Sequence, residues 1–415
     1  MPIFGKGVST LPQVALDGIR VLELSDGIAA PYCAKMFSDY GADVVRIDAP
    51  DSPPTSALDA NNAEQVALYL HLNANKRSVA LDLESERGRG LLRDLALQCD
   101  AIVESMSPGV AEGLGIGYEA LSSSRPDIVM TSVTPFGQTG PYSDWGYTEL
   151  TIFAMTGAMN REGLPNRYPL KYGGEIAQYF AGTTAAAATM AALAGAAFSG
   201  VGDWIDISIM EVMAGHPHQV GRRGPFAYSG ETDNRTDPRT SSAGGREPYA
   251  VGTFKCKDGY VSFLPLGSRM WPNISQMIGQ TELQQDPRFA TPEDRTENRH
   301  ELEEIFQSWL DAHTRMEVFE AAQKAGLPGG PVLHSHETVD NEHFRSRNYF
   351  QDIVHPVYGH LWHTGLPVML RDVPRTASSP APHIGLNSRD VLMEIVGLPE
   401  SEIMELEDSG VIRNG

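Results

Sequence analysis

The sequence predicts an α/β fold whose main sheet contains parallel strands, and two features of its N-terminal half support this. Short apolar runs with the composition of buried strands alternate with segments of helical periodicity. The helical segments act as crossovers, which makes the strands on either side of them parallel. In open sheets of this type ligands bind beyond the carboxyl ends of the strands, so we expect the functional site there.

The first β-α-β unit lies near the N-terminus. Residues 19–25, IRVLELS, have the composition of a buried strand, and residues 32–41, YCAKMFSDYG, that of a helix closed by a glycine. Residues 43–49, DVVRIDA, predict the second strand. We therefore expect the turn at 26–31, DGIAAP, to lie at the carboxyl edge of the sheet.

The same pattern then repeats. Residues 78–83 and 101–105 predict strands on either side of a helix at 85–99, and residues 127–133 predict a further strand. Asp48 ends the second strand, where a ribose-binding acid would lie. The G-x-G-x-x-G sequence is absent from the preceding turn, however, so a dinucleotide site is not expected.

Composition changes in the middle of the chain. Residues 183–198 are dominated by alanine and shorter than a membrane span requires, so we expect a buried helix. Residues 203–213 predict a strand that runs into a helix. Residues 221–248 are polar, rich in Gly, Pro and Arg and without periodicity, which indicates a long loop. An arginine of this loop could hold a substrate carboxylate, or the arginines could simply be solvated.

Beyond this loop, residues 250–266 predict a β-hairpin with an Asp-Gly turn, and helices follow to about residue 325. A last helix is expected at 389–398. These patterns divide the chain into a large domain at 1–205 and 331–415, a linker at 206–224, and a smaller α+β domain at 225–325.

Charge and cysteine content exclude several classes of function. The 415 residues include 53 Asp and Glu against 32 Lys and Arg, a net charge of -21, which disfavours nucleic acid and anionic membrane surfaces as partners. Cys33, Cys99 and Cys256 are far apart and lack metal-ligand spacing, so we expect no metal site and a reduced, cytoplasmic protein. The N-terminus has no signal-peptide pattern, which agrees with that location.

Several stretches of the sequence occur together, in the same order, in one known family. They are GIRVLELSDGIAAPYCAKMFSDYGADVVRIDAP, NANKRSVALDL, SMSPGVAEGLGIGYEAL, SVTPFGQTGPYSDW, WIDISIMEVM, KCKDGYVSF and AGLPGGPV. Through them the chain resembles the family III CoA-transferases, which include formyl-CoA transferases and α-methylacyl-CoA racemases. The resemblance covers nearly the whole chain.

The resemblance implies a Rossmann-like large domain built from both chain ends, a small domain from the middle, and two chains threaded through each other as an interlocked homodimer. It also implies an enzyme that uses coenzyme A as an acyl-CoA substrate and transfers it to a carboxylic acid. Small residues in the first turn and a cation pair before a strand would suit the CoA chain and its phosphates. The CoA-binding residues expected on this basis are Gly27, Ile28, Ala29, Asn73, Asn75, Lys76, Arg77, Ser105 and Met106.

The chain departs from the family at the residues that carry the chemistry. Alignment of PLKYGGEIAQYFAG places Gln178 where the transferases have a nucleophilic aspartate. The racemases pair that aspartate with a histidine, where this chain has Thr148, followed by Glu149. An amide has no proton to give up near neutral pH and is a poor nucleophile, so covalent catalysis through residue 178 is not expected.

Three interpretations remain open. Glu175 could replace the aspartate as nucleophile, because residues three apart on a helix are neighbours. Alternatively, Glu175 or Glu149 could act as a base in a non-covalent lyase, hydratase or isomerase reaction, with Gln178 donating a hydrogen bond to the thioester oxygen. The third interpretation is an acyl-CoA binding protein without transferase activity. CoA transfer is the function expected.

Overall fold

The computed structural model describes residues 14–52, 62–215, 226–230, 235, 251–264, 270–373 and 378–415. It divides into two compact units. One contains residues 1–160, 170–232 and 343–415, and the other contains residues 161–169 and 233–342. The chain thus returns to the first unit at residue 343, whereas the sequence patterns put the return at 331. Residues 216–224 of the expected linker and most of the Arg-rich loop lie outside the described residues, whereas residues 206–215 belong to the larger unit.

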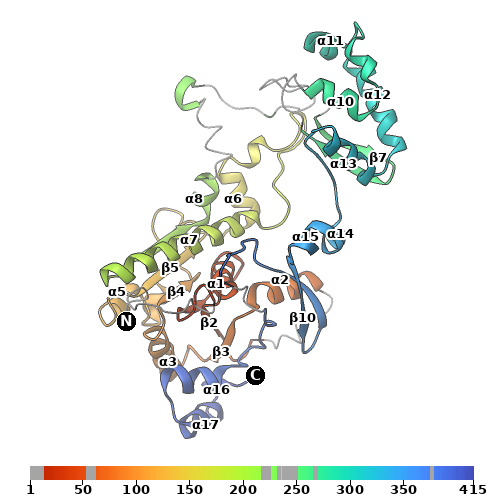
Figure 1. The fold of residues 1–415 in the computed structure, drawn as a ribbon. Coiled ribbons are helices and arrows are strands. Elements are labelled where there is room, and N and C mark those ends of the chain that lie inside the picture. The colour runs from red at the N-terminus through yellow and green to blue at the C-terminus, as the bar shows by residue number, and fades with distance from the viewer. Residues whose placement is uncertain are drawn as a thin grey trace. The chain divides into compact units, whose positions relative to one another are not determined.

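A seven-stranded sheet forms the centre of the larger unit, in the order β12-β3-β2-β1-β4-β5-β6 (Figure 1). All neighbouring pairs are parallel except β12 with β3, so the parallel α/β sheet predicted from the sequence is confirmed. The strands are β1 (Arg20–Leu24), β2 (Asp43–Asp48), β3 (Arg77–Leu81), β4 (Ala101–Glu104), β5 (Val129–Thr134), β6 (Trp204–Ser208) and β12 (Ile412–Arg413).

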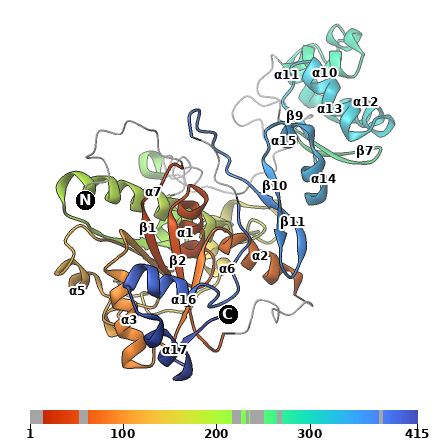
Figure 2. The same cartoon turned by 60° about the horizontal axis from the view of Figure 1, so that its bottom comes forward.

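Both faces of this sheet are covered, which is why apolar residues on its central strands point to either side. Val21 of β1 points into a core shared with α1 and α7, and its neighbour Leu22 points into a second core shared with α3, α16 and α17. Figures 1 and 2 show these two groups of helices on opposite sides of the strands. The helices are α1 (Ala29–Asp39), α7 (Ile176–Ser199), α3 (Glu86–Ala96), α16 (Ser388–Val391) and α17 (Glu400–Asp408).

Helices α1 and α7 approach each other closely because alanine and glycine line their contact. Gly182 lies so near α1 that a Cβ there would be 2.5 Å from the carbonyl oxygen of Ala29. Ala181 and Ala185 of α7 and Ala30 of α1 are fully buried in the same core. The small side chains allow backbone-to-backbone packing, which fixes the N-terminal turn of α7 beside the turn that follows β1.

Helix α7 is the alanine-rich segment of the sequence. Within the described residues it alone has the length and apolar composition of a membrane span, and 39% of that apolar window is buried in the chain. The rest of its surface faces away from the core described here.

The C-terminal region differs from the sequence prediction. One helix was expected at 389–398, but α16 ends at Val391 and continues as a π-helical turn at Leu392–Val396. Gly397, with φ of 84°, then stops the helix, and α17 and β12 follow. The remaining elements of this unit are α2 (Ala63–Asn73), α4 (Val110–Gly113), α5 (Tyr118–Ser122), α6 (Glu149–Met155), α8 (Ile209–Gly215), α15 (Glu342–Ser346), β10 (Phe350–His355) and β11 (Gly359–Thr364).

The smaller unit has its own antiparallel sheet, in the order β7-β8-β9, and its own core. The predicted hairpin is confirmed, since β7 and β8 pair across a turn at Lys257 and Asp258 that Gly259 follows. Phe254, Phe263 and Phe306 pack with ring centroids 5.3 to 6.2 Å apart. The elements are β7 (Gly252–Cys256), β8 (Gly259–Phe263), β9 (Gly329–Pro331), α10 (Trp271–Met277), α11 (Pro292–Glu297), α12 (Arg299–Ala312), α13 (Arg315–Lys324) and α14 (Ser335–Asp340).

The α1–α7 contact gives a first prediction. Replacing Gly182 by Ala should lower the free energy of unfolding by about 1–3 kcal/mol, because the new methyl group collides with the Ala29 carbonyl. Gly195→Ala on the same helix is the control: a Cβ there meets nothing within 4 Å, and the change should stabilise the helix by up to about 1 kcal/mol. If urea unfolding gave both variants the same free energy of unfolding, the close packing of α7 on α1 would be contradicted.

Candidate active site

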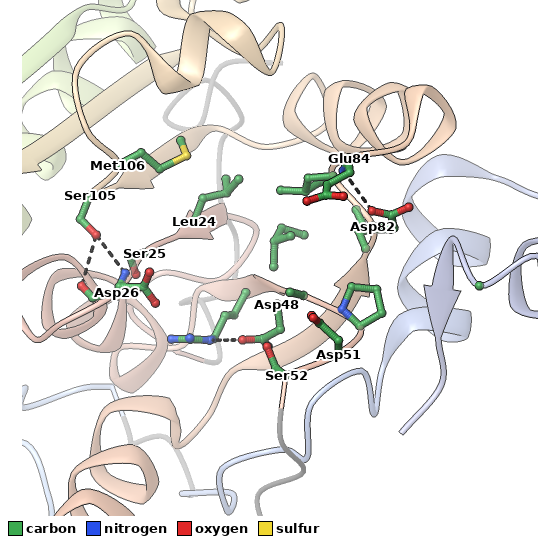
Figure 3. Close-up of a pocket in the computed structure, with 17 residues that line it drawn as sticks. Leu24, Ser25, Asp26, Asp48, Asp51, Ser52, Asp82, Glu84, Ser105 and Met106 are labelled. Atoms are coloured by element: carbon green, nitrogen blue, oxygen red, sulfur yellow. Dashed lines mark hydrogen bonds and ion pairs between the residues drawn. The ribbon is translucent and has the colours of Figure 1, made fainter.

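A cleft of about 590 Å³ opens at the carboxyl ends of β1, β2, β3 and β4 (Figure 3). Ser105 and Met106, both expected from the sequence to bind CoA, lie in its wall. The Ser105 hydroxyl accepts a hydrogen bond from the Asp26 N–H at 2.9 Å and donates to the Asp26 carbonyl oxygen at 3.2 Å. The turn after β4 therefore holds the turn after β1 in place.

Carboxylates dominate the charge of this cleft. Among the described residues that line it the one cation is Arg46, whose Nε donates to Asp48 at 2.8 Å and whose Nη1 lies 3.3 Å from a Glu23 oxygen. These neighbours raise the pKa of the Arg46 guanidinium against its burial. Acidic side chains that accept hydrogen bonds suit hydroxyl groups better than phosphates. The acids that line the cleft are Asp26, Asp48, Asp51, Asp82 and Glu84.

The β1–α1 turn continues from this cleft to the N-terminus of α7. The Gln178 side-chain oxygen accepts a hydrogen bond from the Ile28 N–H at 3.1 Å. Gly27 has a φ of 75°, and a Cβ on it would lie 3.2 Å from the same oxygen. Gln178 is 9% exposed, and its side-chain amide nitrogen has no partner within the described chain. The amide is thus held with its oxygen toward the turn and its two N–H groups available.

Glu149 holds the N-terminus of α7. One of its oxygens accepts the Ala177 N–H at 2.7 Å, while Glu175 occupies the N-cap position without making a side-chain cap. The other Glu149 oxygen is buried and has no hydrogen-bond partner within the described chain. Burial raises the pKa of the Glu149 carboxyl, and the Ala177 N–H opposes this shift. Glu149 therefore positions the helix that carries Gln178.

Two side chains that the sequence did not single out also face this region. The Tyr147 hydroxyl lies 4.0 Å from the position of a Cβ on Gly27, and burial followed by the charges of Glu149 and Glu175 raises its pKa. Lys171 lies in the loop before α7 and donates to the carbonyl oxygens of its own loop. The sequence did offer a signal for Lys171, because this residue opens the KYGGEIAQ stretch that ends at Gln178.

Lys76 does not fit the phosphate-binding role expected from the sequence. Its ammonium group is completely buried, 2.7 Å from a Glu23 oxygen. It also donates to the Pro31 carbonyl at 3.0 Å and to the Asn73 side-chain oxygen at 3.3 Å, so no donor remains for a phosphate. Burial lowers the pKa of Lys76 to about 8. We correct the expectation: Lys76 is half of a buried ion pair beneath the sheet edge.

Three neighbouring residues are likewise engaged within the protein. Asn73 accepts from Lys76 and Arg46, and Asn75 bonds to Asp39 and to the Ser379 N–H. The guanidinium of Arg77 pairs with Asp43 and with Glu394. These contacts fix α2 and the start of β3. The structure therefore brings Gly27, Ile28, Glu149, Glu175 and Gln178 together, with Ser105 and Met106 in the adjoining cleft.

Among the described residues no group of three or more His, Cys, Asp or Glu side chains could hold a metal ion.

Known proteins match the chain over most of its length. The model of CoA-transferase family III matches residues 16–388. A formyl-CoA:oxalate CoA-transferase of Streptomyces coelicolor is 30% identical over 96% of this chain and 99% of its own length. The succinyl-CoA–D-citramalate CoA-transferase of Chloroflexus aurantiacus is 29% identical over 97% of this chain and all of its own. A crystal structure of a CAIB/BAIF family protein from Brucella suis, 27% identical, superposes with a TM-score of 0.81 over 92% of this chain and 100% of that one.

An α/β protein with its site at the carboxyl ends of parallel strands, and with relatives of this kind, is a CoA-thioester enzyme of the transferase class. The chain belongs to CoA-transferase family III. Enzymes of this family move CoA between an acyl-CoA and a carboxylic acid, which confirms the function expected from the sequence.

Glu149 gives a second prediction. Glu149→Ala removes the acceptor for the Ala177 N–H and should lower the free energy of unfolding by about 1–3 kcal/mol, the range for a lost cap or buried hydrogen bond. Glu149→Gln keeps an oxygen acceptor and should retain most of that stability. Chemical denaturation of both variants measures the difference; equal losses would show that the carboxylate charge, rather than the cap, stabilises α7.

Proposed function

We propose that this enzyme transfers CoA at the turn where Gly27, Ile28 and Gln178 meet, with Gln178 binding the thioester and Glu175 supplying the carboxylate. The observation that carries the proposal is the fixed orientation of the Gln178 amide. Because the Ile28 N–H holds its oxygen, the amide presents only donors to a substrate. Donors fixed in this way stabilise the negative charge that develops on a thioester oxygen under attack.

Glu175 is better placed than Glu149 to act on a substrate. The free oxygen of Glu149 is buried, and its other oxygen caps α7. Glu175 is only partly buried, lies one helical turn before Gln178, and makes no cap bond. A carboxylate in this position can approach the same thioester carbon that the Gln178 amide polarises.

The covalent route then runs in balanced steps. The Glu175 carboxylate attacks the thioester carbonyl, and CoA leaves as a thiolate while a mixed anhydride forms. The thiolate attacks the Glu175 carbonyl carbon of that anhydride, which releases the first acid and leaves a glutamyl-CoA thioester. The second carboxylate attacks this thioester to form a new anhydride, and the returning thiolate then attacks its substrate carbonyl, giving the new acyl-CoA and free Glu175.

The amide at residue 178 also favours a second candidate. If no covalent intermediate forms, Glu175 would act as a base that removes a proton next to the thioester carbonyl, with Gln178 stabilising the enolate. This reaction would be an elimination, hydration or isomerisation of an acyl-CoA.

The adjoining cleft would hold the nucleoside end of CoA. Its carboxylates can accept hydrogen bonds from the one free ribose hydroxyl, at O2′, and from the amino group of the base, with the 3′-phosphate directed away from them, and Met106 and Leu24 offer an apolar contact for the base. The relatives named above act on oxalate and D-citramalate, which are small dicarboxylic acids. A carboxylic acid of that size is the acceptor that we propose.

The third prediction separates the two routes by mass spectrometry after incubation with acyl-CoA substrates and hydroxylamine. Covalent transfer should give a hydroxamate on Glu175 and none on Gln178, and Glu175→Gln should abolish it. Gln178→Asp puts a charge beside the thioester oxygen and should lower native turnover by about 10²-fold or more, the scale for a lost oxyanion donor. Turnover without any adduct would support the non-covalent reaction. An adduct that persists in Glu175→Gln would reject Glu175 as the nucleophile.

A homodimer with interlocked chains, which the resemblance to the family implies, belongs to the same proposal. Phe198 and Val201, at the end of α7 and just beyond it, are 83% and 62% exposed. An apolar groove of about 330 Å³ lies between α1 and α7 and is lined by Leu16, Met36, Phe37, Tyr40, Thr183, Ala186, Ala187 and Met190. Apolar surface of this kind supports a protein partner. We place the dimer in the cytoplasm, consistent with three free cysteines.

The fourth prediction concerns this dimer. If the chains are threaded through each other, dissociation requires partial unfolding, and the dimer should persist on dilution. Fluorescence-detected sedimentation at nanomolar concentration should therefore show dimers. Monomers that retain native circular dichroism would reject the interlocked arrangement.

A further inference from the structure

We propose that Lys171, together with the N-terminus of α7, forms a subsite for the second carboxylate of a dicarboxylic acid substrate. This inference rests on the proposed function, because it assumes that the first carboxyl group reacts beside Gln178. It assigns a substrate class and a specificity-determining residue to that site.

The first observation is a fixed cation that has no acidic partner. The Lys171 ammonium donates to the carbonyl oxygens of Tyr172 at 2.9 Å and Gly174 at 2.7 Å. No carboxylate of the described chain lies within ion-pair distance of it, although the chain carries many more acids than bases. Two carbonyl contacts leave one of its three N–H donors for a ligand.

The second observation is the place where this cation is held. Gly174, whose carbonyl binds the ammonium, immediately precedes Glu175, the N-cap of α7. The 24 residues of α7 give that end a positive partial charge, which adds to the charge of Lys171. The ammonium also lies close enough to Glu149 to lower the pKa of that carboxyl, against the larger effect of burial.

The third observation is an accessible amide nitrogen, on a side chain that is otherwise buried, that has no partner within the described chain. Gln178 is the third residue of the same helix and is 9% exposed, with a free amide nitrogen. One helix end therefore presents two separate donors, a neutral amide and an ammonium group. A monocarboxylic acid would use only the first, whereas a dicarboxylic acid can use both.

Neighbouring acids restrict how the ligand binds. Glu149 is turned inward by its bond to the Ala177 N–H, and Glu175 faces the same helix end. The reacting carboxyl group is neutralised when it becomes a thioester, so only the second carboxylate needs a permanent cation. Lys171 meets that need, and its removal should penalise a dianionic acid far more than a monoanionic one.

The test compares matched acids on the full-length enzyme. Linear dicarboxylates of two to six carbons are each paired with the monocarboxylate of the same length, and both binding by calorimetry and CoA transfer are measured. Wild type should prefer the dicarboxylate in at least one pair. Lys171→Met should weaken binding of that dicarboxylate by about 10–100-fold, the value of one charged hydrogen bond, and change the monocarboxylate by less than about 3-fold. Lys171→Arg should restore most of the preference.

A second pair of variants guards against damage to the loop. A Cβ on Gly173 would meet nothing within 4 Å, so Gly173→Asp introduces a carboxylate without a clash. This negative charge in the Lys171 loop repels a dicarboxylate ligand and competes with it for the ammonium. It should weaken dicarboxylate binding, while Gly173→Asn, of the same size, should not.

The outcomes are distinguishable from a failure of the transferase function. Preferential dicarboxylate binding that depends on Lys171, without any CoA transfer, would reject the transfer reaction and keep the subsite. Transfer with no preference in any pair, or equal losses on both acids in Lys171→Met, would overturn the subsite.

Discussion

The close packing of α7 on α1 is the contact on which the site depends. Because Gly182 has no side chain, the backbone of α7 reaches the carbonyl oxygen of Ala29. Gln178 lies one turn earlier on α7 and Ile28 one residue earlier on the chain of α1, so the same approach brings the amide oxygen within 3.1 Å of the Ile28 N–H. Alanine and glycine in α7 are therefore a condition for the chemistry as well as for the core.

Beneath this contact, a buried chain of charges joins the first three strands and the C-terminal segment. Glu23 of β1 meets Lys76 and Arg46, and Arg46 meets Asp48 of β2. Asp48 then accepts from the Ser78 hydroxyl, which in turn accepts from the Gly385 N–H. Removing one member would leave a buried charge without its partner, which costs more than the pair contributes. The network specifies where the C-terminal segment rejoins the sheet.

Local patterns were enough to predict the parallel sheet, since its strands and crossover helices are encoded within each stretch of sequence. Alignment along the chain also predicted Gln178 as the centre of the site, and the structure shows its oxygen bonded to the Ile28 N–H. The same reasoning failed for Lys76, because a lysine before a strand has the same local sequence whether it meets a phosphate or a buried acid. Its burial depends on Glu23, 53 positions earlier in the chain. The cap on Ala177 was hidden for the same reason, since Glu149 comes from another helix.

The amide at residue 178 changes what this helix end can accept. Glu149 and Glu175 already place two carboxylates there, and burial and mutual repulsion raise the pKa of Glu149. An aspartate at 178 would add a third negative charge within one turn of helix, which Lys171 alone could not offset. With a neutral amide at this position, the negative charges of Glu149 and Glu175 face the positive charge of the Lys171 ammonium and the positive end of α7. The amide therefore leaves this helix end less negative than an aspartate would, and an anionic substrate of the class proposed above would be repelled less.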